Sequence, residues 1–115
     1  MDKEYQDLQF AENEFYRAYS LALKTAGSNV GTIARVEKIR IEYDLKESEF
    51  YIELQSGIKV VEALTSQPAT QADHGQERSD RIEKDIELLR KQYATKKSAV
   101  FKAATVKLRA IALGR

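Results

Sequence analysis

Apolar residues recur every third or fourth position in three stretches of the 115-residue chain, and polar residues fill the positions between them. This repeat is typical of amphipathic α-helices. It predicts helices over residues 2–26, 32–64 and 79–113. Gly27 follows the last turn of the first helix, where a glycine commonly ends a helix. The first stripe consists of Tyr5, Leu8, Ala11, Phe15, Ala18, Ala22 and Ala26.

The second stretch has two interpretations. Its heptad-like stripe favours a helix that begins at Thr32 as N-cap. Residues 39–46, however, alternate between apolar and polar side chains, as a half-buried strand does, so that 39–54 could form a hairpin. The helix is preferred because the turn at 46–49 contains no Gly, Asn or Pro. The stripe comprises Ile33, Val36, Tyr43, Phe50, Leu54, Val61 and Leu64, and is interrupted by Arg40, Glu47 and Gly57.

The third stretch gives the most regular pattern, and the polar segment 65–78 before it reads as a linker. Its stripe is Ile82, Ile86, Leu89, Tyr93, Val100, Ala104, Leu108 and Ile111. Two helices of about 33 residues, each roughly 50 Å long, can fold back on each other across such a linker. The expected fold is therefore all-α: one domain, an elongated, coiled-coil-like antiparallel helical hairpin with a shorter N-terminal helix. Because that helix cannot cover the whole hairpin, we expect a homo-oligomer.

Charge is distributed unevenly along this chain. Residues 1–87 contain 11 basic and 18 acidic side chains, a balance of −7, whereas residues 88–115 contain eight basic and no acidic ones, a balance of +8. Such asymmetry is typical of proteins that bind nucleic acid or an acidic partner, and it also suits self-association.

A helical wheel of the basic segment places a row of cations and hydroxyls nearly opposite the apolar stripe, a row we call the ladder. Its members are Lys91, Thr95, Ser98, Lys102, Thr105 and Arg109, while Lys96 and Lys107 lie on another side. Such a row could contact successive phosphates of a nucleic acid without reading its sequence. It is equally typical of a solvated helix face, because Lys and Arg favour helix C-termini. Both interpretations stay open.

A protein interface is the second candidate site. The residues predicted for an oligomer or partner interface are Phe15, Tyr43, Phe50, Leu54, Tyr93 and Val100. They are large apolar or aromatic side chains of the kind that anchor helix–helix contacts.

Catalysis and cofactors have little support in the residues. The chain has no cysteine and a single histidine, His74, in the polar linker, so we predict no metal site, no catalytic residue and no cofactor. Charges interrupt every window long enough to span a bilayer, and the first residues lack the order of a secretory signal. We therefore expect no membrane partner and a cytoplasmic location.

The order of elements resembles that of small helical phage proteins. The resemblance is carried by "ARVEKIRIEYDLKESEFYIELQ" in the second helix and "LLRKQYATKKSAVFKAATVKLRAI" in the third. Some of these proteins are similar to phage recombination mediators, which assemble as oligomers, bind single-stranded DNA and help to load a recombinase. The resemblance implies a location in the host cytoplasm, but no short motif assigns a role to a particular residue.

Two functions are therefore expected. The first is a non-enzymatic oligomeric helical protein that binds the nucleic-acid backbone, as an accessory factor in phage-type DNA recombination. The alternative is a coiled-coil protein-interaction module, an adaptor or small inhibitor, without a role in nucleic-acid binding.

Overall fold

The computed structural model describes residues 2–65 and 75–115, and three helices account for nearly all of them. They are α1 (Lys3–Ala26), α2 (Val30–Thr65) and α3 (Gly75–Ala112). The described residues contain no strand, so the predicted all-α class is confirmed and residues 39–54 are helical rather than a hairpin. Helix α3 begins at Gly75, four residues before the predicted position, and most of the predicted linker lies outside the described residues.

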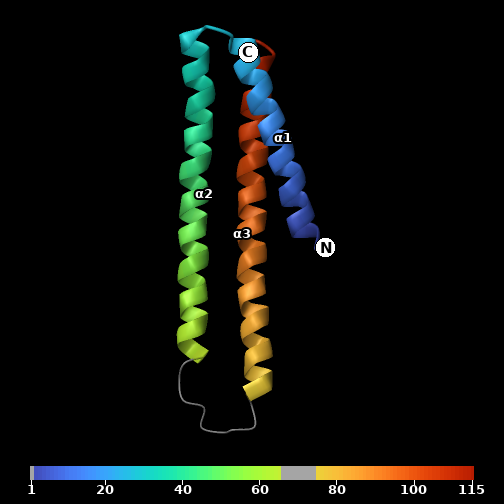
Figure 1. Cartoon of the computed structure of the whole chain (residues 1–115), viewed down its shortest axis with the longest axis vertical. Helices are drawn as coiled ribbons and strands as arrows, with labels where there is room; N and C mark the ends of the chain where they lie inside the picture. The colour runs from blue at the N-terminus through green and yellow to red at the C-terminus, as the bar shows by residue number, and fades with distance from the viewer. Residues whose placement is uncertain (1, 66–74) are drawn as a thin grey trace.

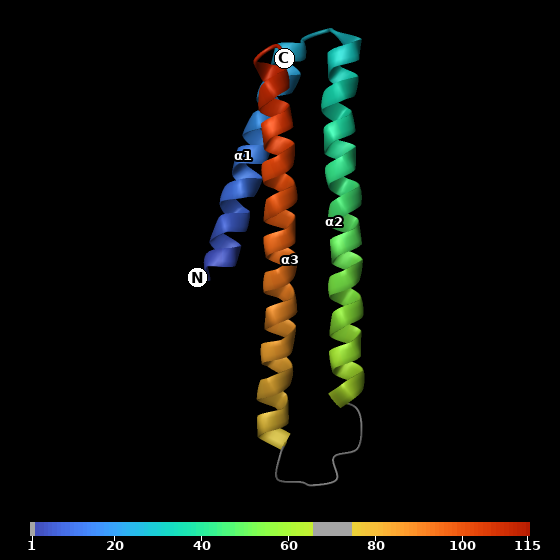
Figure 2. The same ribbon diagram turned by 180° about the vertical axis from the view of Figure 1, so that it is seen from behind.

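The helices form an elongated and rather flat arrangement with α3 in the middle (Figure 1). Helices α2 and α3 run antiparallel along the full length, and α1 runs parallel to the C-terminal half of α3. The principal extents are 67 × 24 × 15 Å. In both views the N-terminal end of α1 diverges from α3 (Figure 2). Because α1 is shorter than α2 and α3, the described part of the other half of the hairpin has no third helix.

A short turn connects α1 to α2. Gly27 adopts a positive φ of 57°, and its N–H donates to the carbonyl of Leu23 at 3.2 Å, which ends α1 as predicted. Helix α2 then begins two residues before the predicted position. The cap is Asn29 and not Thr32, because the backbone N–H of Thr32 donates to Oδ1 of Asn29 at 3.0 Å. This is the usual contact between an N-cap side chain and the third helical residue.

The core lies where all three helices meet. The ring centroid of Phe101 on α3 lies 5.0 Å from that of Phe15 on α1 and 4.3 Å from that of Tyr43 on α2. The α1 stripe adds buried alanines, small residues that allow α1 to pack closely against α3. The fully or almost fully buried apolar residues are Ala11, Phe15, Ala18, Ala22, Ala26, Val36, Tyr43, Ala94, Phe101, Ala104, Leu108 and Ile111.

This core covers only half of the hairpin. Among the described side chains between residues 44 and 93, none is buried. There α2 and α3 pack as a pair, and the side chains between them stay half-buried. We call this set the open seam: Phe50, Leu54, Ile58 and Val61 of α2 with Ile82, Ile86, Leu89 and Tyr93 of α3.

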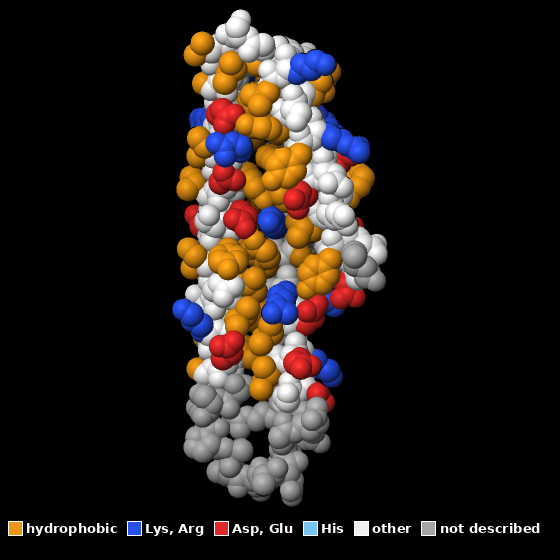
Figure 3. Space-filling model, in the orientation of Figure 1, with side chains coloured by type: hydrophobic (Ala, Val, Ile, Leu, Met, Phe, Trp, Pro, Cys, Tyr) orange, Lys and Arg blue, Asp and Glu red, His pale blue; other side chains and the backbone are white. Residues whose placement is uncertain are grey.

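Two helices alone have too little surface to enclose a seam, and this explains the partial burial. Gly57 brings the helices close, since a Cβ at this position would lie 3.0 Å from Cδ1 of Leu89. Figure 3 shows apolar side chains gathered between α2 and α3 down to the end of the described residues. The sequence predicted this stripe, and the structure leaves it accessible to solvent.

Candidate interaction surfaces

The predicted ladder does not form one solvent-facing row, because α1 packs against it. Ser98 and Thr105 are only 5% and 4% exposed. The Thr105 hydroxyl donates to the carbonyl of Phe101 at 2.7 Å, whereas Oγ of Ser98 has no hydrogen-bond partner within the described part of the chain. A helical wheel cannot separate a solvated face from a face of small residues that another helix covers. Ser and Thr suit either face, because their hydroxyls can bond to the preceding turn.

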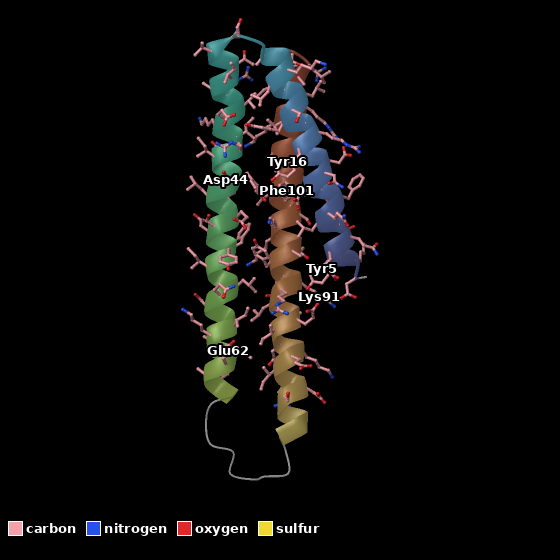
Figure 4. The ribbon with its side chains drawn as sticks, in the orientation of Figure 1. Tyr5, Tyr16, Asp44, Glu62, Lys91 and Phe101 are labelled. Atoms are coloured by element: carbon pink, nitrogen blue, oxygen red, sulfur yellow. The ribbon has the colours of Figure 1, made fainter. Side chains whose placement is uncertain are left out.

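The ladder cations at the two ends of this face are paired with acids of α1. Nζ of Lys91 lies 3.2 Å from a carboxylate oxygen of Asp2, and this hydrogen bond raises the pKa of Lys91. Arg109 donates to Glu14. Figure 4 shows Lys91 and Tyr5 close together where α1 begins.

The two lysines predicted to lie outside the ladder are paired with acids of α2. Nζ of Lys96 lies 2.8 Å from Glu53, and that of Lys107 lies 3.9 Å from Glu42. The acidic and basic parts of the sequence therefore neutralise each other in part within one chain. Many of the cations in the basic C-terminal segment thus form ion pairs with acids of α1 and α2.

Three ladder residues remain exposed: Arg109, which is paired with Glu14, and two others, Thr95 and Lys102. Thr95 and Lys102 border a shallow hollow that is also lined by Glu4 and Asp7 of α1. Within the described residues Lys102 makes no ion pair. Apart from the paired Arg109, the exposed part of the ladder is thus one lysine and one threonine beside two carboxylates.

The predicted interface residues fall into two groups. Phe15 and Tyr43 belong to the core, with 1% and 7% exposure, so they are not accessible to a partner of the folded chain. Val100 is half-buried and packs against that core. Only Phe50, Leu54 and Tyr93 remain as candidates, and all three belong to the open seam. They also line a hollow of about 210 Å³ together with Glu53, Leu89, Gln92 and Lys96.

A polar cluster marks the boundary between the core and the open seam. The Tyr93 hydroxyl donates to Oε1 of Glu47, and Nζ of Lys97 lies 3.8 Å from the same carboxylate. The Lys97 ammonium also lies over the rings of Tyr93 and Phe101, at 5.7 and 5.8 Å from their centroids. Burial, helped by the hydrogen bond to Glu47, raises the pKa of Tyr93. The cluster therefore lies where the buried core ends and the open seam begins.

Beyond this cluster, in the half with the open seam, two charged residues of α3 lie level with apolar residues of α2. Because α2 and α3 are antiparallel, Arg90, seven residues before Lys97, lies level with Leu54, seven residues after Glu47. A further seven residues along each helix, Glu83 lies level with Val61. A shift of seven residues preserves the face of a helix. Arg90 and Glu83 therefore lie level with apolar residues of α2, and neither makes an ion pair with any described residue; Arg90 also lies close enough to Tyr5 for its charge to act on that hydroxyl. We call Glu83 and Arg90 the rim charges.

The rim charges are not among the residues that the sequence pattern predicted as a site. The signal was present, because the two residues occupy equivalent positions beside the apolar stripe, two turns apart and with opposite charge. Recognising it required knowledge of which charges α1 and α2 already neutralise.

Tyr5 ties the start of α1 to α3. Its hydroxyl donates to Oε1 of Glu87 at 2.8 Å. Burial, together with this hydrogen bond, raises the pKa of Tyr5 to about 12. The contact holds the N-terminal end of α1 beside Glu87, and beyond this point the described part of the hairpin has no third helix.

Over the described ranges no three His, Cys, Asp or Glu side chains come together as metal ligands, and no helix is long and apolar enough to cross a membrane. His74 lies outside these ranges. The fold and its surfaces thus define the class of an elongated three-helix protein with one half-open apolar seam. Comparison with known protein families, with curated proteins and with solved structures gave no match. The resemblance to phage recombination mediators stays a prediction.

Proposed function

We propose that this chain is a non-enzymatic protein-interaction module that docks a helical partner on its open seam. The observation that carries the proposal is the end of the buried core at Tyr43 and Ala94, beyond which the described apolar side chains of α2 and α3 stay accessible. A seam of this kind is stabilised when further helices cover it, and burial of apolar area is the main favourable term in such docking.

The surface of the same half supports this proposal. Tyr51, Ile52 and Val60 of α2 and Leu88 of α3 are 50%, 64%, 59% and 57% exposed. Tyr51 adjoins the open seam, since its ring centroid lies 6.2 Å from that of Tyr93, and such a continuous apolar surface is typical of an interaction site. Helix α2 has apolar residues on several sides, a pattern typical of helices with more than one packing neighbour.

Site-specific photo-crosslinking in cells tests this function. A benzophenone amino acid at Ile58, inside the open seam, is compared with the same group at Ser20, an exposed position of α1. We expect protein adducts from position 58 and few from position 20. Equal yields at both positions, or no protein adduct at position 58, would contradict the proposal.

Nucleic-acid binding is the second candidate. It is supported by the exposure of Lys102 and by ion pairs at the surface, since the Lys96, Lys107 and Arg109 side chains are 50%, 61% and 54% exposed. Such cations can exchange a carboxylate for a phosphate, because exposed ion pairs contribute little free energy.

Salt-titrated binding to single-stranded DNA measures this second function. Lys91, Lys102 and Arg109 are changed together to Glu, and Lys24, an exposed lysine of α1, is changed alone as a control. We expect weaker binding and a shallower salt dependence in the triple variant at unchanged helicity. Equal DNA retention by the triple variant and the parent chain would rule these residues out as phosphate contacts.

A further inference from the structure

The rim charges and the open seam form one continuous surface. Ile86 of the seam lies between Glu83 and Arg90 along α3. Both rim charges are exposed, and neither has an ion-pair partner in the part of the chain that the structure describes. On the α2 side the level residues are Leu54 and Val61, which are apolar and half-buried. A ligand for this surface needs apolar side chains flanked by one cation and one anion, two helical turns apart.

A second copy of this chain meets that requirement when it lies antiparallel. We propose that two chains pack their open seams together around a twofold axis near Ile86, so that Arg90 of each faces Glu83 of the other. The proposal rests on the proposed function, in which the open seam is the docking surface. It adds the identity and the direction of the partner.

The direction follows from the charges. In a parallel pair each rim charge would face its own copy, Glu83 against Glu83 and Arg90 against Arg90, and like charges in contact oppose association. In the antiparallel pair both contacts join opposite charges. Charged residues beside an apolar stripe commonly set partner choice and orientation in this way.

The shape of the chain is compatible with this arrangement. In the half of the hairpin that contains the core, α1 supplies the third helix, and its N-terminal end lies near Glu87 and diverges from α3. The second copy would supply the missing helices in the other half. The result is a four-helix bundle of two open seams, the usual way for two helical hairpins to enclose a shared core.

Charge reversal with mixing tests this proposal. Sedimentation velocity over a dilution series is measured for the full chain, for Glu83→Arg, for Arg90→Glu, for the double variant, and for an equimolar mixture of the two single variants. Controls with the same charge changes are Asp85→Arg and Arg81→Glu, both exposed and about 200° around α3 from Glu83.

We expect the parent chain to form dimers. Each single variant should dissociate at about tenfold higher concentration, because two unlike contacts become two like ones. The double variant should regain the affinity of the parent. The mixture should also regain it, because a Glu83→Arg chain and an Arg90→Glu chain form two opposite-charge contacts with each other in the antiparallel dimer. The controls should behave as the parent.

Three results would overturn the proposal: a parent chain that stays monomeric at its highest soluble concentration, a mixture no tighter than either single variant, or controls as weak as the single variants. Crosslinks from Ile58 to a different protein would then leave the proposed function standing without the second copy. Absence of any protein crosslink at Ile58 would remove the proposed function itself.

Discussion

Replacement of Ser98 by alanine should stabilise this protein. Oγ of Ser98 lies in the contact between α1 and α3, in a residue only 5% exposed, and it has no hydrogen-bond partner among the described residues. Burying a hydroxyl without a partner costs about 1–3 kcal/mol in proteins. Alanine also has a higher helix propensity than serine, by roughly 0.5 kcal/mol. The small space left by the oxygen offsets part of this gain, so we expect a net increase in the free energy of unfolding of about 1–2 kcal/mol.

Thermal and urea unfolding, followed by circular dichroism, measure this change. For a domain of this size, each kcal/mol corresponds to roughly 3–6 °C in Tm, so Ser98→Ala should raise Tm by several degrees. Two matched variants serve as controls. Thr95→Ala changes an exposed hydroxyl and should have little effect. Thr105→Ala removes a buried methyl and a hydroxyl that donates to Phe101, and should destabilise by about 1 kcal/mol.

An unchanged or lower Tm for Ser98→Ala would refute this reasoning. It would mean that the hydroxyl reaches water or a polar partner, as the ladder interpretation expects for a residue that contacts phosphate. A loss of DNA binding without any gain in stability would point in the same direction.

Three further predictions concern the core, the turn and the tyrosines. Phe101→Ala should lower the free energy of unfolding by about 3–5 kcal/mol in urea unfolding, because the ring is 1% exposed between Phe15 and Tyr43; a loss below about 1 kcal/mol would contradict the three-helix core. Asn29→Ala should cost about 1 kcal/mol by removing the cap of α2, whereas Ser28→Ala should have little effect, and equal effects would argue against the cap. Tyr5 should keep its proton to higher pH in the folded than in the unfolded chain, so its stabilising contribution is complete below pH 10 and is lost as pH rises through about 12. Tyrosinate absorbance and helicity measured together from about pH 9 to about 12.5 test this, and a Tyr5→Phe variant with an unchanged alkaline titration would contradict it.

The apolar pattern was sufficient to predict the helices. The α1 stripe placed Ala11, Phe15 and Ala22 on the buried face, and the structure confirms all three. A period near 3.6 can be read from local sequence because it depends only on helix geometry. The cap was less accessible, since Asn29 and Thr32 are both good N-cap residues and the choice between them depends on where the preceding turn directs the backbone.

The candidate sites were harder to predict than the helices. Ser98 and Thr105 lie on a face that the wheel assigned to solvent, yet α1 covers that face. Phe15 and Tyr43 are apolar, as an interface residue would be, but they are used inside the chain. Composition alone does not indicate whether a small or apolar face meets another helix of the same chain, a second chain or water.

The sequence by itself determined the class of this protein, the positions of its helices and the apolar stripes, because these depend on interactions between residues close in the chain. Only the tertiary structure decided which stripe is covered. Helix α1 lies on the Ser98 face of α3, with its N-terminal end near Glu87, so the Lys91 and Arg109 charges are paired with acids of α1. Glu83 and Arg90 have no ion-pair partner among the described residues and lie beside the open seam. The physical reason is that burial and ion pairing depend on which distant segments meet, and helical periodicity carries no information about that choice.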